Sequence, residues 1–403
     1  MQIQSIDIEG FRSLRSLGGK LARLNVIVGP NGCGKSNLYR SLELLKFASQ
    51  KQLARAVAEE GGMKSIRWAG RKIPNSTNQI RIQVEWDELA YELIIGEEVA
   101  DPTGPFPQDP YIKTEKIWFR GERKTEMVRR AGPRLLHRDD EGGWVEYPFE
   151  LANNESMLSL LREPSRFPII LKVRNEVMSW RFFHTFRTDP ESPLRKPQVA
   201  WRTTVLDGDG GNLAATVMTI QSGKLADEFN KSVRMALPDA NVRVLGHAQT
   251  PLREVGVEFK GLPRTWAGRE LSDGTLRFIA LAAALFTDEP PSLMVLNEPE
   301  TSLHPSTFPA LAYAINKAAE RSQVLLVTHS PVLAEEINKL RPIKIRTLRI
   351  SGRGTELDTQ PVVEQPHLDG YLLNCDSNAI VSARHSTNLE SGINQQQSVA
   401  KNK

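Results

Sequence analysis

The chain has 403 residues, of which 40% are hydrophobic and 25% charged, and its formal net charge is +4. This is the composition of a globular protein with a substantial core, and its mildly basic charge permits nucleic-acid contact without requiring it. Two cysteines, Cys33 and Cys375, are too few for a disulfide framework. No segment has the ~20 apolar residues of a membrane helix or the core of a secretory signal. We therefore expect a cytoplasmic protein without membrane contact.

The N-terminal part predicts strand, turn and helix. Residues 2–9 alternate as in a β-strand, and residues 21–28 form an apolar, buried strand. A glycine-rich turn follows, and then a helix from about Lys35 whose one face is formed by Leu38, Leu42 and Leu45. Gly61 and Gly62 end this helix or its continuation. We take residues 1–62 as the first part of an α/β core.

Residues 63–255 have a different pattern, in which short alternating runs are broken by Pro and Gly. This pattern predicts an inserted, antiparallel β-rich lobe with some helix and without a coiled coil. From 256 to 350 the α/β pattern returns. It predicts a helix over ELSDGTLRFIALAAALF with Ser272 as N-cap, a strand over SLMVLNEP, a helix over PSTFPALAYAINKAAERS and a strand over QVLLVTHSP. Residues 351–403 are predicted to be a polar extension, disordered from about 385.

The turn after residues 21–28, GPNGCGKS, matches G-x-x-x-x-G-K-[ST] between a strand and a helix. Its backbone N–H groups and the N-terminus of the helix suit phosphate oxygens. Lys35 is predicted to neutralise the β- and γ-phosphates, and Ser36 to bind Mg²⁺ directly. The pattern therefore indicates an ATP and Mg²⁺ site, and the expected nucleotide contacts are Asn31, Gly32, Cys33, Gly34, Lys35, Ser36 and Asn37.

Three later motifs accompany this loop: ELSDGTLRF, VLNEPETSLHP and LLVTHSP. Taken singly, their polar residues have ordinary interpretations as a helix cap, a surface acid and a buried histidine. Their order, with the opening EGFRSL, resembles the ABC-type ATPase heads of the RecF/Rad50/SMC-like group, and in particular RecF-like AAA-type ATPases. The resemblance covers residues 1 to about 50 and 255 to about 340. It implies a P-loop NTPase of ABC-ATPase type with a two-lobed head.

The resemblance also implies roles for particular residues. Glu298 would be the general base, His329 would sense the γ-phosphate, and Lys35 would complete the catalytic set. Ser272 and Gly274 of the signature motif, with Ser302 of the D-loop, would contact the nucleotide of a second protomer, so that ATP induces a homodimer. Asp273 and Thr275 depart from the commoner signature LSGGQ. The Q-loop glutamine of such heads has no clear counterpart in the middle of the chain.

Asn297 stands where the resembling ATPases carry an aspartate that holds a water molecule of Mg²⁺. An amide oxygen can still accept that hydrogen bond, and replacing a charged acceptor by a neutral one costs on the order of 1 kcal/mol. Loss of a general base costs about 10²–10⁴ in rate, and Glu298 is present. We expect Asn297 to contact Mg²⁺ through water and hydrolysis to be retained but slow.

The strongest basic stretch is WFRGERKTEMVRRAGPRLLHR, which predicts a hairpin. Alternate residues of a strand share a face, so two interpretations stay open: a stripe suited to double-stranded DNA, or a solvated outer face. The residues that would form the stripe are Arg123, Lys124, Arg129 and Arg130. The run SWRFFHTFR, residues 179–187, is expected to be a core strand rather than a base-stacking platform.

Three functions compete for this chain. The first is an ATPase of DNA repair, recombination or anti-phage defence. The second is an ATP-dependent regulator of a separately encoded effector, without DNA contact of its own. The third, the nucleotide-binding subunit of a transporter, is disfavoured by the long segment between Lys35 and Ser272 and by the missing LSGGQ.

Overall fold

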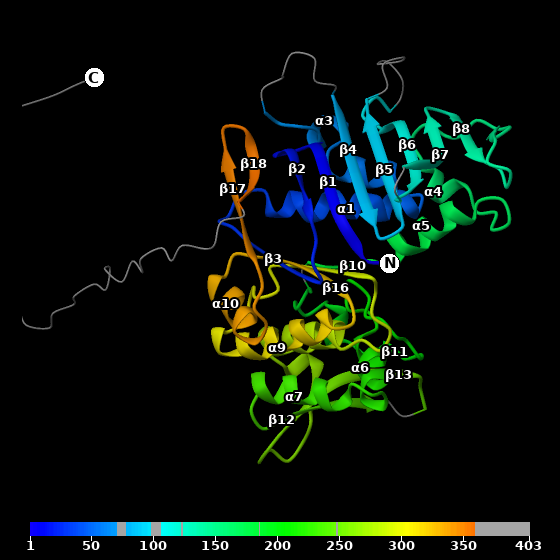
Figure 1. The fold of residues 1–403 in the computed structure, drawn as a ribbon. Coiled ribbons are helices and arrows are strands. Elements are labelled where there is room, and N and C mark those ends of the chain that lie inside the picture. The colour runs from blue at the N-terminus through cyan, green and yellow to red at the C-terminus, as the bar shows by residue number, and fades with distance from the viewer. Residues whose placement is uncertain (71–77, 98–105, 122–123, 185, 247–248, 359–403) are drawn as a thin grey trace, which may run out of the picture. The chain divides into compact units, whose positions relative to one another are not determined.

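Three β-sheets organise the residues that the computed structural model describes, which are 1–70, 78–97, 106–121, 124–184, 186–246 and 249–358 (Figure 1). These residues fall within one unit, Met1–Val362. The tail predicted to be disordered from about 385 lies outside the described residues. Within them, no helix combines the length and the apolar character needed to cross a bilayer.

The first sheet is antiparallel and has eight strands in the order β2-β1-β4-β5-β6-β7-β8-β9. Along its strands one face is apolar and the other polar; in β1, for example, Ile6 and Ile8 are buried, whereas Glu9 is exposed. The bounds are β1 Ile3–Phe11, β2 Leu14–Lys20, β4 Gln79–Trp86, β5 Leu89–Gly96, β6 Tyr111–Phe119, β7 Thr125–Ala131, β8 Arg134–Arg138 and β9 Trp144–Glu146.

The second sheet has six strands in the order β10-β15-β16-β3-β17-β18, parallel except for the last pair. Its central strands are continuous apolar runs, as expected for a parallel sheet that is covered on both faces. The carboxyl ends of β3, β15 and β16 therefore lie at one edge. The bounds are β3 Leu24–Val28, β10 Arg181–Phe183, β15 Leu293–Asn297, β16 Gln323–Thr328, β17 Ile345–Ser351 and β18 Gly354–Asp358.

The third sheet is small, and β13 pairs with β11, β12 and β14. Its bounds are β11 Gln198–Val199, β12 Ala240–Gly246, β13 Leu252–Phe259 and β14 Trp266–Ala267. The helices are α1 Lys35–Ser49, α2 Leu53–Glu59, α3 Met63–Ile66, α4 Met157–Leu160, α5 Pro168–Ser179, α6 Leu213–Ser222, α7 Ala226–Ala236, α8 Asp273–Leu285, α9 Phe308–Ala319 and α10 Pro331–Leu340. The longest of these described helices, α1, has 15 residues.

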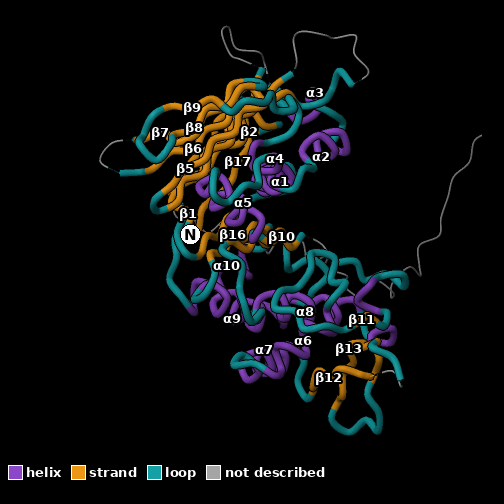
Figure 2. The backbone as a smooth tube through the Cα atoms, turned by 90° about the vertical axis from the view of Figure 1, so that its right-hand side faces the viewer, coloured by secondary structure: helices purple, strands orange, loops and turns teal. Residues whose placement is uncertain are grey.

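Two hydrophobic cores lie on opposite faces of the parallel sheet. Alternate residues of β15 divide between them: Leu293 and Val295 join the core beneath the first sheet, and Met294 and Leu296 join the core beneath α8 and α9. This division follows the two-residue period of a strand. In Figure 2, α1 lies on the side of the first sheet, whereas α6 to α9 lie on the other side of β16. The expected α/β head is confirmed.

The predicted boundaries of the inserted lobe do not coincide with the ends of sheets. Residues 63–255 contribute to all three: β4 to β9 extend the sheet that begins with β1 and β2, β10 joins the parallel sheet, and β11, β12 and the first half of β13 belong to the third. The reason is that β4 pairs along β1, from Ile3↔Trp86 to Glu9↔Arg81. Backbone pairing thus joins segments that composition separates.

Lys46 connects α1 to the segment before β10 through a hydrogen bond. Its Nζ donates to Trp180 O at 2.9 Å and lies 5.7 Å from the Phe182 ring centroid. Burial, reinforced by Arg181, lowers the pKa of Lys46 from 10.5 to about 8. Between about pH 8 and pH 10.5, Lys46 is protonated in the unfolded chain and neutral in the folded chain. The free energy of unfolding therefore increases as the pH rises through this range.

This shift predicts how Lys46→Met differs from the wild type. As the pH rises from about 8 to about 10.5, the free energy of unfolding should rise for the wild type relative to the variant. Urea unfolding of both proteins at several pH values measures the difference. A difference that stays constant across this window would contradict the lowered pKa.

Candidate ATP site

The loop before α1 has the backbone geometry of a phosphate cradle. Gly32 and Gly34 have φ angles of 79° and 97°, in the left-handed region that favours glycine. A Cβ on Gly34 would collide with the Thr355 and Ser13 hydroxyls, whereas one on Gly32 would meet no atom within 4 Å. The loop therefore packs against β18 on one side and is open on the other, at the N-terminus of a 15-residue helix. Such a terminus attracts anions.

Lys35 is buried beneath this loop and held by its carbonyls. Its Nζ donates to Gly29 O at 2.8 Å and to Pro30 O at 2.9 Å. The same Nζ lies 3.5 Å from Glu298 Oε1, so the loop and the end of β15 meet at this lysine. The predicted phosphate ligand and the predicted general base are thus brought together by β3 and β15, which flank β16 in the parallel sheet.

An unusual backbone conformation orients the side chain of Glu298. Its φ is 48°, a left-handed value that costs a residue other than glycine of order 1–3 kcal/mol. The backbone thus leaves the direction of β15 while Glu298 N still donates to Val327 O at 2.7 Å. Glu298 Oε1 lies 3.5 Å from Lys35 Nζ, and Glu298 Oε2 lies 4.0 Å from His329 Nδ1. This placement suits a carboxylate that accepts a proton from a water molecule beside a bound phosphate.

Glu300 is a second acid at this site that the sequence reasoning did not single out. It is buried, and its Oε1 accepts from His329 N at 3.0 Å and from the Thr328 hydroxyl. The same oxygen lies 3.1 Å from His329 Nδ1, closer than either oxygen of Glu298. Glu300 therefore holds the predicted switch histidine in place, and the second Glu of NEPE, directly after the strand, was the available signal.

His184 is another residue that the sequence reasoning missed. It follows β10, and its Nδ1 lies 2.9 Å from Asn297 Nδ2 while its Nε2 lies 3.2 Å from Tyr39 Oη. Partial desolvation and the Arg40 guanidinium lower the pKa of His184, which favours the neutral imidazole. A neutral ring that accepts from the Asn297 amide at Nδ1 donates to the Tyr39 hydroxyl from Nε2. The segment 179–187 does contribute a core strand, with Phe182 and Phe183 buried. A polar residue directly after an apolar run was the signal for a site at the sheet edge.

The residues present fit a magnesium ion held together with nucleotide phosphates. Asn297 Oδ1 is buried and has no hydrogen-bond partner, because the amide nitrogen is the atom that faces His184. The Ser36 side chain is exposed at the first turn of α1. Mg²⁺ takes few protein ligands and keeps several waters beside substrate phosphates. Ser36 would hold the ion directly and Asn297 through water, and the ion would neutralise phosphate charge when bound.

The remaining predicted cradle residues lie around the same loop. Asn31 and Gly32 are exposed, and the Asn37 side chain donates to Ser13 Oγ at 2.7 Å. Cys33 is buried, and its carbonyl accepts from the Thr355 hydroxyl at 2.9 Å. Its thiol therefore packs inside the loop, and only its backbone is placed to contact a nucleotide.

The predicted signature residues open α8. Ser272 is the N-cap, and its Oγ accepts from Thr275 N at 3.2 Å, which confirms the predicted cap. Arg195 pairs with Asp273 and donates to Leu271 O at 2.7 Å, so it fixes the loop before the helix. A Cβ on Gly274 would lie 3.1 Å from Ser302 O. The signature helix and the D-loop of one chain are therefore in contact.

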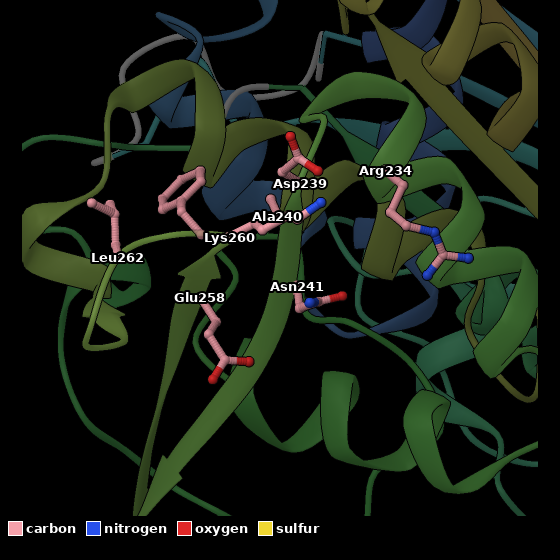
Figure 3. Close-up of a pocket in the computed structure, with 8 residues that line it drawn as sticks. Arg234, Asp239, Ala240, Asn241, Glu258, Lys260 and Leu262 are labelled. Carbon is pink, nitrogen blue, oxygen red and sulfur yellow. The ribbon is translucent and has the colours of Figure 1, made fainter.

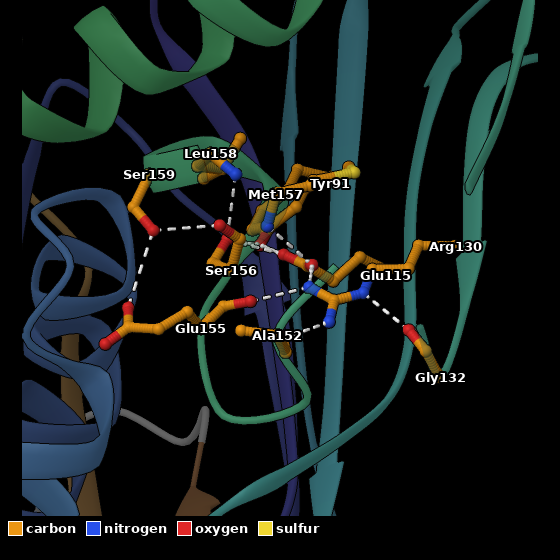
Figure 4. Close-up of polar contacts among 10 residues, drawn as sticks. All are labelled: Tyr91, Glu115, Arg130, Gly132, Ala152, Glu155, Ser156, Met157, Leu158 and Ser159. Atoms are coloured by element: carbon orange, nitrogen blue, oxygen red, sulfur yellow. Dashed lines mark hydrogen bonds and ion pairs between the residues drawn. The ribbon is translucent and has the colours of Figure 1, made fainter. Parts of the chain in front are cut away.

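The basic stretch lies on β6 to β8, but one of its arginines points inward. Arg130 is fully buried and pairs with Glu115 at 3.0 Å (Figure 4). The prediction that Arg130 contacts DNA is therefore wrong, because the alternation along β7 directs Val128 and Arg130 to the core and Arg129 to the outer face. Arg123 lies outside the described residues.

Two of the predicted DNA contacts remain on the outer side of this sheet. The Lys124 Nζ lies 3.7 Å from the Trp118 ring centroid. The Arg129 guanidinium lies 4.7 Å from the Trp144 ring centroid, and Arg138 covers the same ring at 4.6 Å. Trp144 therefore orients arginine side chains on this face through cation–π contacts.

A pocket of about 430 Å³ lies elsewhere, between the end of α7 and the β12–β13 hairpin (Figure 3). Its lining includes Arg234, Asp239, Asn241, Glu258 and Lys260. Cations and carboxylates are mixed there, so it lacks the single-sign field that attracts a polyphosphate. The loop before α1 is the better nucleotide site.

Two family models match the chain on either side of its middle. Residues 1–159 match the model described as "AAA ATPase domain". Residues 243–335 match the model described as "AAA domain, putative AbiEii toxin, Type IV TA system". The first match contains Lys35, and the second contains Ser272, Glu298 and His329. In both segments the chain is therefore similar to AAA ATPase domains, as its resemblance to RecF/Rad50/SMC-like ATPases implies.

Individual relatives are distant or short. A segment of 93 residues is 33% identical to the Multidrug efflux ATP-binding/permease proteins of Mycobacterium bovis and Mycobacterium tuberculosis, covering 23% of this chain and 8% of theirs. The fold is similar to an SmcHead bound to the C-winged helix domain of ScpA, with a TM-score of 0.50, 14% identity and coverage of 90% and 98%. It is equally similar to an Smc head with an extended coiled coil bound to the C-terminal domain of ScpA derived from Pyrococcus furiosus, with a TM-score of 0.50, 13% identity and coverage of 89% and 96%.

Proposed function

We propose that the protein binds ATP with Mg²⁺ between two copies of itself and hydrolyses it, so that ATP closes a homodimer and hydrolysis opens it. The observation that carries the catalytic part is the position of Glu298, whose carboxylate lies 3.5 Å from Lys35 Nζ and 4.0 Å from His329 Nδ1. The test is Mg²⁺-dependent phosphate release from ATP by the purified chain. Absence of turnover would contradict the proposal.

The dimer is supported by the surface around the start of α8. Ser272 and Asp273 are exposed, and Ser302 and His304 are exposed beside them. A helix N-terminus leaves backbone N–H groups without intrahelical partners, and Ser272 caps only one of them here. The others are available to the phosphates of a nucleotide on a second protomer, which is where the resemblance places Ser272, Gly274 and Ser302.

Turnover is expected to be slow, because the side chain that would hold a water molecule of Mg²⁺ is the neutral amide of Asn297. Asn297 Nδ2 lies 2.9 Å from His184 Nδ1, which leaves the Asn297 oxygen for a water molecule of the ion. The loss relative to a carboxylate is on the order of 1 kcal/mol. That loss weakens the site for Mg²⁺ but leaves the proposed general base, Glu298, in place.

We further propose a cytoplasmic role in DNA repair, recombination or anti-phage defence, with double-stranded DNA contacting the outer face of β6 to β8. On that face Lys116 pairs across the ladder with Arg129, and both lie 3.9 Å from the single carboxylate of Glu126. Two cations thus share one acid, which leaves positive charge for phosphates. Regulation of a separately encoded effector without DNA contact is the alternative.

This interface predicts the behaviour of Arg129→Glu. The variant should bind double-stranded DNA more weakly at every sequence, with a salt-dependence slope lower by about 1, because one phosphate contact is lost. Fluorescence anisotropy at several salt concentrations measures both quantities. The matched control is Arg55→Glu on α2, whose side chain is 77% exposed and pairs with Glu59.

If Arg129→Glu and Arg55→Glu bind DNA like the wild type, this face does not contact DNA. If the wild type does not bind DNA at all, the regulator alternative is favoured. Co-purification with the product of a neighbouring gene would then identify the effector.

A further inference from the structure

Arg277 and Glu300 are two buried charged residues whose hydrogen-bonding capacity is not filled. The two residues are 5% and 4% exposed. Arg277 Nε and Glu300 Oε2 are buried without a hydrogen-bond partner. No ion pair joins the two side chains, both of which lie in the described part of the chain. A buried polar atom of a charged group that lacks a hydrogen bond is costly, so Arg277 Nε and Glu300 Oε2 need an explanation.

The two residues lie on elements that contact each other. Arg277 is on α8, one turn after Gly274, and Glu300 is two residues before Ser302. A Cβ on Gly274 would lie 3.1 Å from Ser302 O, so the start of α8 and the 298–302 segment are packed together. Burial lowers the pKa of the Arg277 guanidinium, and the negative charge of Glu300 partly opposes this shift.

The other oxygen of Glu300 is fully used. Glu300 Oε1 accepts from His329 N at 3.0 Å and from Thr328 Oγ1, and it lies 3.1 Å from His329 Nδ1. A change in the position of the Glu300 carboxylate would therefore change the position of His329. The His329 Nδ1 also lies 4.0 Å from Glu298 Oε2. Glu300 thus contacts His329 and belongs to the segment that packs against the start of α8.

We propose that Arg277 is a positioning residue: when two heads close on ATP, its guanidinium pairs with Glu300 Oε2 and thereby sets the orientation of His329. Because the start of α8 carries Ser272, this pair connects the surface that contacts the partner's nucleotide with the hydrolytic residues of the same chain. This inference rests on the proposed ATP-dependent dimer. Through this pair, contact with the partner's nucleotide would control ATP hydrolysis in the chain that carries Arg277.

The test is a double-mutant cycle on ATP turnover with Arg277→Gln, Glu300→Gln and the double variant. Arg277→Gln should lower kcat with KM changed less than about 3-fold, because the pair forms after ATP is bound. The losses should be non-additive by a factor within the about 5- to 150-fold range of coupled sites. Arg277→Lys, which keeps the charge, should recover part of kcat.

The matched control is Arg321→Gln. Arg321 also contacts α8, but at its other end, where it donates to Leu285 O at 3.0 Å and to Thr287 O at 2.8 Å. Because these bonds are structural, the control should lower the melting temperature and leave kcat within about 2-fold.

Each outcome decides a different claim. Additive losses, or equal losses of kcat in Arg277→Gln and Arg321→Gln, would overturn the role of Arg277 while leaving the ATPase intact. If Arg277→Gln does not fold, Arg277→Met, which also removes the charge, takes its place in the cycle, and losses that are additive with Glu300→Gln would overturn the pair. A wild type that neither turns over ATP nor dimerises with it would overturn this inference together with the proposed function.

Discussion

Glu298→Gln is expected to lower ATP turnover by about 10²–10⁴, the usual contribution of a general base. Glutamine keeps the size and the left-handed backbone of the residue but cannot take a proton. ATP binding should be retained, because the cradle and Lys35 are unchanged. The measurements are single-turnover hydrolysis with Mg²⁺ and ATP affinity by equilibrium titration.

A matched control for this substitution is Glu335→Gln, an exposed acid on α10. It removes the same charge from the chain without touching the site, so its turnover should equal that of the wild type. Equal turnover of Glu298→Gln and Glu335→Gln would show that Glu298 is not the base.

Arg130→Met is expected to lower the free energy of unfolding by about 3–5 kcal/mol, the usual cost of breaking a buried ion pair from one side. Arg130 Nε donates to Gly132 O at 2.7 Å, and its Nη1 lies 3.0 Å from Glu115 Oε2. Glu115 also accepts from Tyr91 Oη at 2.6 Å and from Met157 N at 2.8 Å (Figure 4). The variant would leave the Glu115 carboxylate buried without its cation.

The control for this prediction is Arg134→Met on the neighbouring strand. Its side chain is 76% exposed and lies 3.8 Å from Glu146, an arrangement that contributes about 0–1 kcal/mol. Denaturant unfolding of both variants measures the difference. A loss below about 1 kcal/mol for Arg130→Met would mean that the Glu115 network is not needed for stability.

Helix starts and helix caps could be predicted from the sequence, because they depend on residues that are close together in the chain. Ser272 was predicted as an N-cap from its position before an apolar-periodic segment, and its side chain does accept from the helix. The helix starting at Lys35 follows from a glycine turn and from its leucines, and Leu38, Leu42 and Leu45 are all buried. These features depend on neighbours within a few residues, so the sequence contains them.

Features that depend on distant pairing were not predictable in the same way. The inward direction of Arg130 is set by the register between β6 and β7, where Glu115 faces it. His184 meets Asn297 because β10 pairs with β15, two strands far apart in the sequence. Neither the aromatic run nor the basic run contains that information, which explains why His184 was missed and Arg130 was assigned to the wrong face.

The central claim is that ATP joins two heads across Ser272 of one and Lys35 of the other. The most direct test is the molar mass of Glu298→Gln by light scattering, with and without Mg²⁺ and ATP. We expect it to rise from that of one 45.1-kDa chain to twice that value when ATP is added, and to stay unchanged when Ser272→Arg is added to the variant. A mass that stays at one chain with saturating ATP would contradict the account.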